Sequence, residues 1–387
     1  MDTTSTEIKE FHKTSTEEGI ASQRLVESIL RSELFLRQYK RLALNTFWFT
    51  IGNIGSKSIN FLMLPIFTRY LLPADYGRVE VLNTTISLLM PVVSLQLIEA
   101  IFRFAVEARG DVDRSRKVLT TSLVFMLWTF FLFLLFHPVL ANFEIMKQYR
   151  IFFYTIFLSS MVFGALKQFT RGIDKITVYV ASDILYSSFF AISNSVLLIY
   201  FKFGILAYLL SSILSQVLCI LFLVFAGRLY KYLKPVFDKE LLKEMLRYSV
   251  PLIPNGIMWW IVTALDRYVL AYNLGYDATG IYSVAARFPT LITVLSSIFF
   301  QAWQLSAMEE YGNAGFKTFF QNVFIVVSTF FVLTSSLLLI LIKPFVSVYI
   351  GGAYSESWRY SVFLILGAVY QIFASFYGVI YSSSKKQ

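Results

Sequence analysis

Charged residues are scarce in this chain. Asp, Glu, Lys and Arg make up 15% of its 387 residues, whereas they make up about a quarter of ordinary soluble domains. Hydrophobic residues reach 57%, and the mean hydropathy is +0.63. Because such a chain has too few polar side chains to cover a water-facing surface, a water-soluble enzyme is excluded and a lipid-embedded protein is predicted.

Cysteine and histidine are rarer still. The one cysteine, Cys219, lies in an apolar run, which excludes a disulfide framework or a cysteine metal site. The two histidines, His12 and His137, are too few for a histidine metal cluster. The first 41 residues lack the apolar core and cleavage site of a signal peptide. We therefore expect no catalytic residues, no metal and no cofactor, and we expect the polar tail to be retained.

Long apolar runs are what the sequence has in abundance. A spanning helix needs about 20 mainly apolar residues. Such runs occur near 43–66, 79–104, 118–137, 149–166, 178–200, 204–226, 248–272, 281–303, 319–342 and 360–382. Because lipid offers the backbone no hydrogen-bond partner, runs of this kind form α-helices. The sequence predicts an all-α polytopic membrane protein with about ten transmembrane helices.

Positive charge is unevenly divided between the two sides of these helices. With the N-terminus in the cytoplasm, few of the 34 Lys and Arg residues lie in outer segments, namely Arg69, Arg78, Lys147, Arg150, Lys202, Lys343 and Arg359. Cytoplasmic segments carry the excess of Lys and Arg, so both ends of the chain are predicted to be cytoplasmic. The net charge of +10 then reflects topology and attraction to anionic lipid, and no nucleic-acid partner is expected.

Two outer turns share a sequence pattern that indicates an internal repeat. In each turn an Arg-Tyr pair, an acidic residue and a helix-opening glycine follow in order, and the glycines are Gly77 and Gly280. Aligning these two glycines without gaps places Ser87 on Thr290 and Ser94 on Ser297. Internal repeats are typical of transporters. We expect a cytoplasmic tail (1–41), a six-helix lobe (42–226), a basic linker (227–247) and an incomplete second lobe of four helices (248–387) around a central cavity.

Polar residues form stripes along four of the predicted helices, at spacings that keep them on one helical face. The stripes are Asn53, Lys57 and Asn60; Thr84, Ser87, Ser94, Glu99 and Arg103; Asn255, Thr263, Asp266 and Arg267; and Arg287, Thr290, Thr293, Ser297, Gln301 and Gln304. Glu99 and Arg103 are spaced as an ion pair. A charge near the bilayer centre costs roughly 2.5–3.5 kcal/mol, so Lys57 and Arg287 are expected to face protein or water. The alternative is that charges near helix ends reach the interface and that Ser and Thr pack helices together.

The stretch NIGSKSINFLMLPIFTRYLLPADYG at 53–77, with LQLIEAIFRF at 95–104, resembles the bacterial polysaccharide and O-antigen flippases. These belong to the multidrug/oligosaccharidyl-lipid/polysaccharide exporter superfamily. PLIPNGIMWWIVTALDRYVL at 251–270 fits the start of their second lobe, so the resemblance covers about 42–387. It implies two helical bundles with more spans than this chain contains, and we therefore expect the chain to be truncated at its C-terminus.

This resemblance implies a function and roles for the stripes. It implies flipping of polyprenyl-diphosphate-linked oligosaccharide across the bacterial inner membrane by alternating access, for a polysaccharide such as the O-antigen of lipopolysaccharide. The implied partners are this lipid, membrane lipids and a polysaccharide polymerase or assembly protein. We assign Lys57 and Arg287 to the diphosphate. The residues assigned to sugar or water are Asn53, Asn60, Asn255, Thr290 and Gln301, with Trp259 and Trp260 as stacking platforms or interfacial anchors, and those assigned to gating or ion coupling are Glu99, Arg103, Asp266 and Arg267.

Two other functions fit parts of the sequence. A small-molecule or multidrug exporter of the same superfamily would share the fold, although the cationic stripes argue against a cationic drug. A membrane glycan polymerase or ligase needs a large outer loop with paired charges, and the longest outer loop expected here covers only 343–359. The preferred function is therefore that of a translocase and not of an enzyme.

Overall fold

Helices make up nearly all of the described chain. A computed structural model of the protein describes residues 50, 52, 54–142, 144–310 and 315–383, so the expected tail 1–41 and Asn53 lie outside the described residues. From Gly52 onward the chain is a single unit. Helical residues 54–62 lead into α2 (Leu64–Tyr70), α3 (Pro73–Val93), α4 (Leu97–Glu107), α5 (Val112–Leu134), α6 (His137–Leu140), α7 (Glu144–Gly172), α8 (Ile176–Ile199) and α9 (Ile205–Ala226). They are followed by η1 (Leu229–Lys231), α10 (Lys239–Ser249), η2 (Val250–Leu252), α11 (Ile253–Ala285), α12 (Pro289–Glu310), α13 (Phe316–Tyr349), η3 (Gly352–Tyr354) and α14 (Ser357–Ser383).

The helices confirm a multi-pass membrane protein. Seven described helical stretches are long and apolar enough to cross a membrane, and an eighth is added if α3 and α4 count as one bent span. One of the seven, Lys239–Phe300, contains two of the spans expected from the sequence. The all-α polytopic fold predicted from the apolar runs is therefore correct, and the number of spans is close to that expected.

The second expected span is broken into α3 and α4. The two helices are bent by 56°, and between them Leu95 and Gln96 have φ values of 49° and 54°. Pro91 lies inside the last turn of α3, where it removes one backbone donor and crowds the preceding turn. The break follows directly after this proline, which is a usual cause of a sharp kink.

α11 is two helical segments joined at Gly275, and these correspond to the expected seventh span and the start of the eighth. Gly275 has a φ of 81°, a conformation that glycine adopts readily and other residues avoid. On either side of this bend, the Tyr282 hydroxyl donates to Asp266 Oδ2 at 2.5 Å. The chain therefore turns back on itself here. The second segment ends at Ala285, and Pro289 then opens α12.

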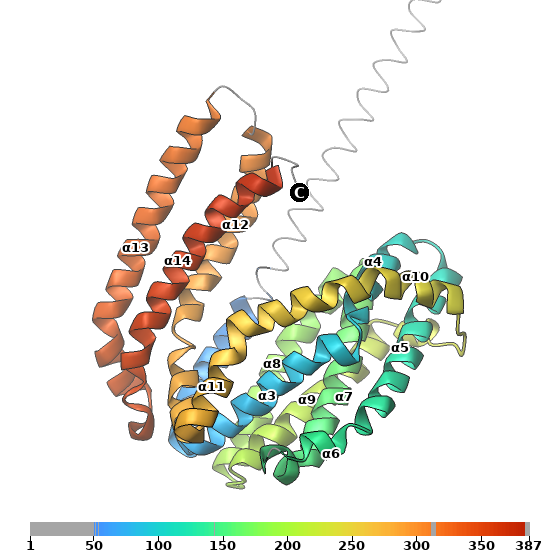
Figure 1. Cartoon of the computed structure of the whole chain (residues 1–387), viewed down its shortest axis with the longest axis horizontal. Helices are drawn as coiled ribbons and strands as arrows, with labels where there is room; N and C mark the ends of the chain where they lie inside the picture. The colour runs from blue at the N-terminus through green and yellow to red at the C-terminus, as the bar shows by residue number, and fades with distance from the viewer. Residues whose placement is uncertain (1–49, 51, 53, 143, 311–314, 384–387) are drawn as a thin grey trace, which may run out of the picture. The chain divides into compact units, whose positions relative to one another are not determined.

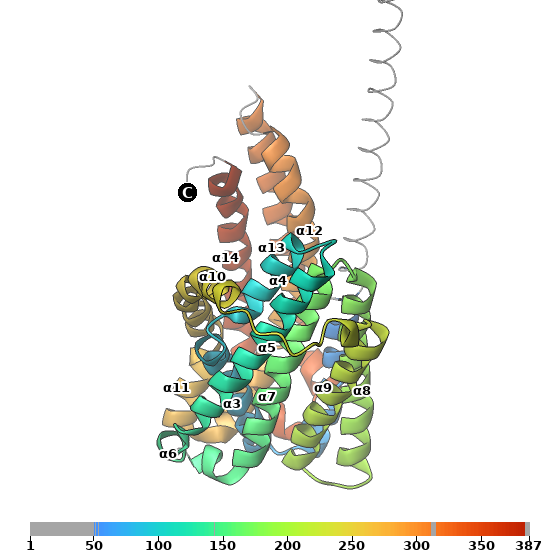
Figure 2. The same cartoon turned by 90° about the vertical axis from the view of Figure 1, so that its right-hand side faces the viewer.

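Three apolar clusters hold the helices together. The largest joins α3, α4, α5, α7, α9 and α10, and Figure 2 shows α8 and α9 running side by side next to α7. A second lies among α12, α13 and α14, where Trp303 stacks on Phe376 at 4.5 Å between ring centroids. α11 lies along α3 for most of its length (Figure 1). The third cluster contains residues from both ends of the chain and positions the candidate site.

Candidate functional site at the junction of the two halves

The third apolar cluster joins the first half of the chain (residues 54–226) to the second half (residues 253–383). Leu64, Phe67 and Tyr76 from the first half are buried together with Phe288 and Val346 from the second. They lie near the turns after α2 and after α13, which the charge distribution predicts to face away from the cytoplasm. We call this cluster, with the polar contacts described next, the outer junction.

An ion pair connects the two halves inside the outer junction. Arg287 lies in the interruption between α11 and α12, and its Nη2 donates to Glu80 Oε1 of α3 at 2.5 Å and to the Tyr76 hydroxyl at 3.2 Å. The Glu80 side chain is 9% exposed and that of Arg287 is 39% exposed. Loss of Arg287 would leave the buried Glu80 carboxylate uncompensated, which costs about 3 kcal/mol, the low end of the range for buried pairs. The pair is therefore costly to separate unless another charge replaces one partner.

The Arg287 guanidinium is only partly occupied by these contacts. A guanidinium carries five N–H donors, and both hydrogen bonds described above are made by Nη2. Within the described chain, Nε and Nη1 have no hydrogen-bond partner. With more than a third of the side chain exposed, the remaining donors are free to bind an anion in the fork geometry that carboxylates and phosphates favour.

Hydrogen bonds between a side chain of one half and the backbone of the other reinforce the outer junction. The Tyr354 hydroxyl donates to the Leu71 carbonyl at 3.2 Å, and the Tyr349 hydroxyl donates to the Phe61 carbonyl at 3.1 Å. The Gly351 amide donates to Thr68 Oγ1 at 3.1 Å. Thr68 and Leu71 lie at the end of α2, and Phe61 lies in the helical residues before it. The contacts therefore fasten the end of α13 and the turn after it to the end of the first span.

The other residues assigned to substrate lie on exposed helical faces. Lys57 and Asn60 are exposed, as are Asn255 and Thr290, and among the described residues Lys57 has no ion-pair partner. Thr290 Oγ1 donates to the Arg287 carbonyl, which places the threonine one turn from the ion pair. Asn53 and the side chain of Gln301 lie outside the described residues. Their proposed contacts with substrate therefore stay predictions.

The four residues assigned to gating or coupling divide into two groups. Asp266 and Arg267 form an ion pair at 2.7 Å, which the Tyr282 hydroxyl joins through Asp266. Arg103 does not pair with Glu99, so that expectation is wrong. Its Nε donates to Glu107 Oε1 at 3.2 Å, and its guanidinium lies over the Tyr248 ring at 4.4 Å. Glu99 is exposed.

The polar stripe on α3 is mostly a packing feature. Thr84 and Ser94 are buried, and their hydroxyls donate to backbone carbonyls one turn earlier, those of Glu80 and Met90. The indole of Trp260 is also buried, and its Nε1 donates to the Thr84 carbonyl at 2.7 Å. The Trp260 hydrogen bond fastens α11 to α3, whereas the two hydroxyls are satisfied within their own helix. Ser87 is the exposed member of this stripe.

Sequence reasoning missed Glu80 and Tyr76, which hold Arg287. One signal was present, because Glu80 is an acidic residue in a run expected to span the membrane, and such residues are usually functional. Where the structure describes the chain, it contains no group of three His, Cys, Asp or Glu residues that could hold a metal ion.

Comparison with known proteins decides the family. Residues 42–304 match the family described as "Polysaccharide biosynthesis protein". The chain belongs to this family. No match was found among proteins with curated descriptions.

Solved structures identify the fold of this family member. The chain is similar to a multidrug resistance MATE family transporter of the MOP superfamily in its inward-facing conformation, with a TM-score of 0.65, 15% identity, and 84% coverage of each chain. It is also similar to a MOP superfamily transporter from Pyrococcus furiosus, with a TM-score of 0.59 and 14% identity over 89% of this chain and 82% of that one. A MATE protein in a straight conformation gives a TM-score of 0.58 and 14% identity, with the same coverage of 89% and 82%. The polysaccharide biosynthesis protein thus has the fold of MOP-superfamily transporters.

Proposed function

We propose that this polysaccharide biosynthesis protein is a MOP-superfamily transporter that flips polyprenyl-diphosphate-linked oligosaccharide across the bacterial cytoplasmic membrane. The observation that carries the proposal is Arg287, a half-exposed cation at the outer junction with donors left free by Glu80 and Tyr76. A diphosphate supplies the acceptors that such a guanidinium pairs with best. The family match and the transporter fold support the same function.

The contacts between the halves support alternating access as the mechanism. In the proposed cycle, the arrangement with a sealed outer junction is the state closed toward the outside. Opening that side requires Arg287 to leave Glu80, and the diphosphate is the charge that replaces this carboxylate at Arg287. Lys57 is the second proposed phosphate contact, since a charged residue placed among apolar residues is costly unless it serves a ligand or a water-filled path. Asn60, Asn255 and Thr290 are proposed to contact sugar hydroxyls.

The test uses the full chain in lipid vesicles that contain a labelled polyprenyl-diphosphate oligosaccharide. An impermeant enzyme that modifies the sugar reports how much of the glycan has reached the outer leaflet. We expect the wild-type chain to raise the rate of sugar exposure above that of empty vesicles, and Lys57→Ala to lower it at equal protein content. Lys57→Arg should retain most of the rate because it keeps the charge. A rate of sugar exposure with the wild-type chain that equals the rate in empty vesicles would contradict the proposal.

Export of small molecules is the second candidate, and the similarity to a multidrug resistance MATE family transporter favours it. Exporters of lipophilic cations bind positive charge, whereas Arg287 and Lys57 are themselves positive. The same vesicles can therefore separate the two functions. Saturable uptake of a lipophilic cation dye, unaffected by added polyprenyl diphosphate, would favour drug export over glycan flipping.

A further inference from the structure

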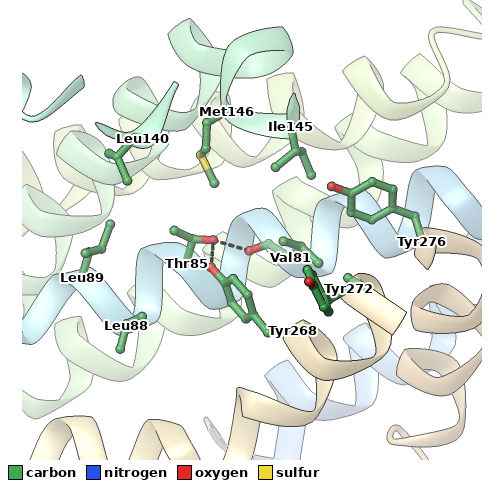
Figure 3. A pocket seen from close by; sticks show the side chains of 11 residues that line it. Val81, Thr85, Leu88, Leu89, Leu140, Ile145, Met146, Tyr268, Tyr272 and Tyr276 are labelled. Atoms are coloured by element: carbon green, nitrogen blue, oxygen red, sulfur yellow. Dashed lines mark hydrogen bonds between the residues drawn. The ribbon is translucent and has the colours of Figure 1, made fainter. Parts of the chain in front are cut away.

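An apolar trough runs along the face of the molecule formed by α3, α5 and α6, and the translocation site does not include it. Its first part is a cavity of about 420 Å³ between α3, α7 and α11. Figure 3 shows Leu140, Ile145 and Met146 on one side of this cavity and Tyr268, Tyr272 and Tyr276 of α11 on the other. A second cavity of about 490 Å³ shares Leu89 and Leu140 with the first, so the two are adjacent.

The trough continues from the second cavity toward α10. A third cavity of about 420 Å³ shares Phe125 and Trp128 with the second and ends at Phe237 and Leu242. The first cavity lies beside the outer turn of α11, whereas Leu242 belongs to the predicted cytoplasmic linker. The trough therefore extends from the predicted outer end of the protein to its predicted inner end.

The walls of the trough fit hydrocarbon and not sugar. Their side chains are aliphatic or aromatic with few exceptions, and the main polar pair in the first cavity is already satisfied. Thr85 Oγ1 donates to the Val81 carbonyl at 2.6 Å, and it shares a second hydrogen bond with the Tyr268 hydroxyl. Tyr272 and Tyr276 add hydroxyls to the first cavity, and Tyr272 is almost fully exposed. A sugar hydroxyl buried beyond these tyrosines, against the aliphatic walls, would lose its water without gaining a partner, which costs about 1–3 kcal/mol for each group.

The length of the trough selects one kind of hydrocarbon. Val81 and Val93, which line the first and second cavities, are 12 residues apart on α3, and this is about 18 Å along the helix at 1.5 Å per residue. The third cavity carries the trough further, to Leu242 of α10. Half of the hydrocarbon core is about 15 Å thick, so a trough of this length extends past the midplane. An acyl chain anchored in one leaflet ends near the midplane, whereas a long isoprenoid chain continues past it. A trough of this length therefore fits an isoprenoid chain better than an acyl chain.

The outer mouth of the trough carries cationic side chains suited to a phosphate. Arg78 lies over the ring of Tyr276 at 5.5 Å, and it pairs with Asp75 at 2.8 Å. Lys147 and Arg150 are exposed on the first turns of α7, directly after Met146. Glu144 and Asp277, which follows Tyr276, are also exposed, so three carboxylates offset the three basic charges while the basic side chains remain the hydrogen-bond donors for a phosphate. This mouth contains three of the few basic residues in the predicted outer segments.

We propose that this trough binds the isoprenoid chain of the carried lipid along its length. The proposal rests on the proposed flipping function and adds to it a place for the tail, which stays on the protein surface while the head group moves past Arg287. Because the trough passes both leaflets, the tail does not have to leave the protein during the movement. The phosphate of the translocated lipid then lies near Arg78, Lys147 and Arg150.

Photo-crosslinking on the full chain in vesicles tests this assignment. The probes are a long-chain polyprenyl diphosphate without sugar and a phosphatidylglycerol, each carrying the same photoreactive group in its hydrocarbon tail. We expect the polyprenyl probe to label residues 81–93, 125–136 and 268–276, and the phospholipid probe to label them weakly. Equal labelling by both probes, or polyprenyl labelling spread evenly over other lipid-facing helices, would overturn the proposal.

Two variants sharpen the experiment. Leu89→Trp fills the point where the first two cavities meet, and we expect it to lower polyprenyl labelling by about tenfold, which corresponds to ~1.4 kcal/mol of binding. Leu214→Trp on α9, where the leucine is 48% exposed, is the matched control and should change little. If Leu89→Trp does not fold, Trp128→Ala removes an exposed wall of the trough and should lower the labelling as well. Unchanged labelling in the folded variants contradicts the proposal.

The outcomes also separate this inference from the proposed function. Labelling of the trough without any flipping of glycan would leave the trough as an isoprenoid site and remove the flippase function. Flipping of glycan with no labelling of the trough would keep the function and remove the tail site.

Discussion

Gly77 of α3 and Gly280 of α11 lie against each other in a reciprocal contact. A Cβ atom at Gly77 would clash with the Tyr276 carbonyl oxygen, and a Cβ atom at Gly280 would clash with the Pro73 carbonyl oxygen. In each case the carbonyl belongs to the residue four positions before the opposite glycine. The two positions that align in the internal repeat are thus related by an approximate twofold axis at this crossing.

Alanine at either glycine should weaken the outer junction. Gly77→Ala and Gly280→Ala each force two backbones apart, and overpacking of this kind costs about 1–3 kcal/mol. We expect a lower thermal midpoint for both variants in detergent. Gly367→Ala in α14 is the matched control, because a Cβ atom there meets no other atom within 4 Å, and it should leave the midpoint unchanged or slightly raised. Midpoints equal to wild type for the two junction variants would mean that the crossing is loosely packed.

The pair of Arg287 and Glu80 allows structure and transport to be separated. Arg287→Gln alone leaves Glu80 buried and unpaired, so stability should fall by on the order of 3 kcal/mol. In the double variant Glu80→Gln with Arg287→Gln no charge remains unpaired, and stability should largely return. If Arg287 serves the diphosphate, sugar exposure in vesicles stays low in the double variant although its stability is restored. Recovery of the flipping rate together with stability would show that Arg287 acts only through Glu80.

The sequence predicted the helical fold because apolar runs of spanning length have few other structures available in lipid. The sequence also aligned Gly77 with Gly280 as equivalent positions of a repeat, and the structure brings these two glycines into contact, which the alignment did not predict. Breaks within spans were harder to predict. Pro91 lies just before the break after α3. At Gly275 the chain turns within one helical element, α11, which contains the expected seventh span and the start of the eighth.

Side-chain contacts between distant helices could not be predicted from the spacing of residues in the sequence. Arg103 has an acidic residue four positions away on each side, and spacing alone does not choose between them. In the structure its ring contact with Tyr248 accompanies the choice of Glu107. Likewise, Glu80 and Arg287 are 207 residues apart, so their pairing depends on the crossing of α3 and α11 and not on any local pattern.

The N-terminus of α10 gives a prediction about pH. Asp238 caps this helix by accepting from the Leu241 amide at 3.1 Å, and it pairs with Lys117 at 3.0 Å. The Leu241 hydrogen bond, and then the Lys117 ammonium, hold the pKa of this carboxyl below its usual value. A carboxyl with a depressed pKa stabilises the fold above its unfolded pKa of about 3.9, and this contribution is lost as the pH falls through the folded pKa.

Two substitutions at Asp238 should separate the cap from the charge. Asp238→Asn keeps an acceptor for the Leu241 amide, so it should remove part of the loss of stability on acidification while costing little at neutral pH. Asp238→Ala removes the cap and should cost about 1 kcal/mol at neutral pH. Thermal midpoints measured in detergent between pH 3 and pH 7 provide the comparison. An acid dependence that is the same in wild type and Asp238→Asn would assign it to other carboxyl groups.

Water access decides whether the exposed polar stripes line a transport path. Asn60 and Leu62 are neighbours on the first span and both are exposed, and Thr290 and Leu291 are a similar pair on α12. Exposure alone does not show whether water or lipid covers them. A thiol reacts with a water-soluble reagent only where water allows the thiolate to form.

With Cys219→Ser as the background, single cysteines at Asn60, Ser87, Thr290 and Ser297 should react quickly, and cysteines at Leu62, Leu89 and Leu291 should react slowly. Added polyprenyl-diphosphate oligosaccharide should protect the first set. Equal protection of both sets without substrate would mean that the polar residues face lipid or neighbouring helices, and the proposed path past Arg287 would lose its support.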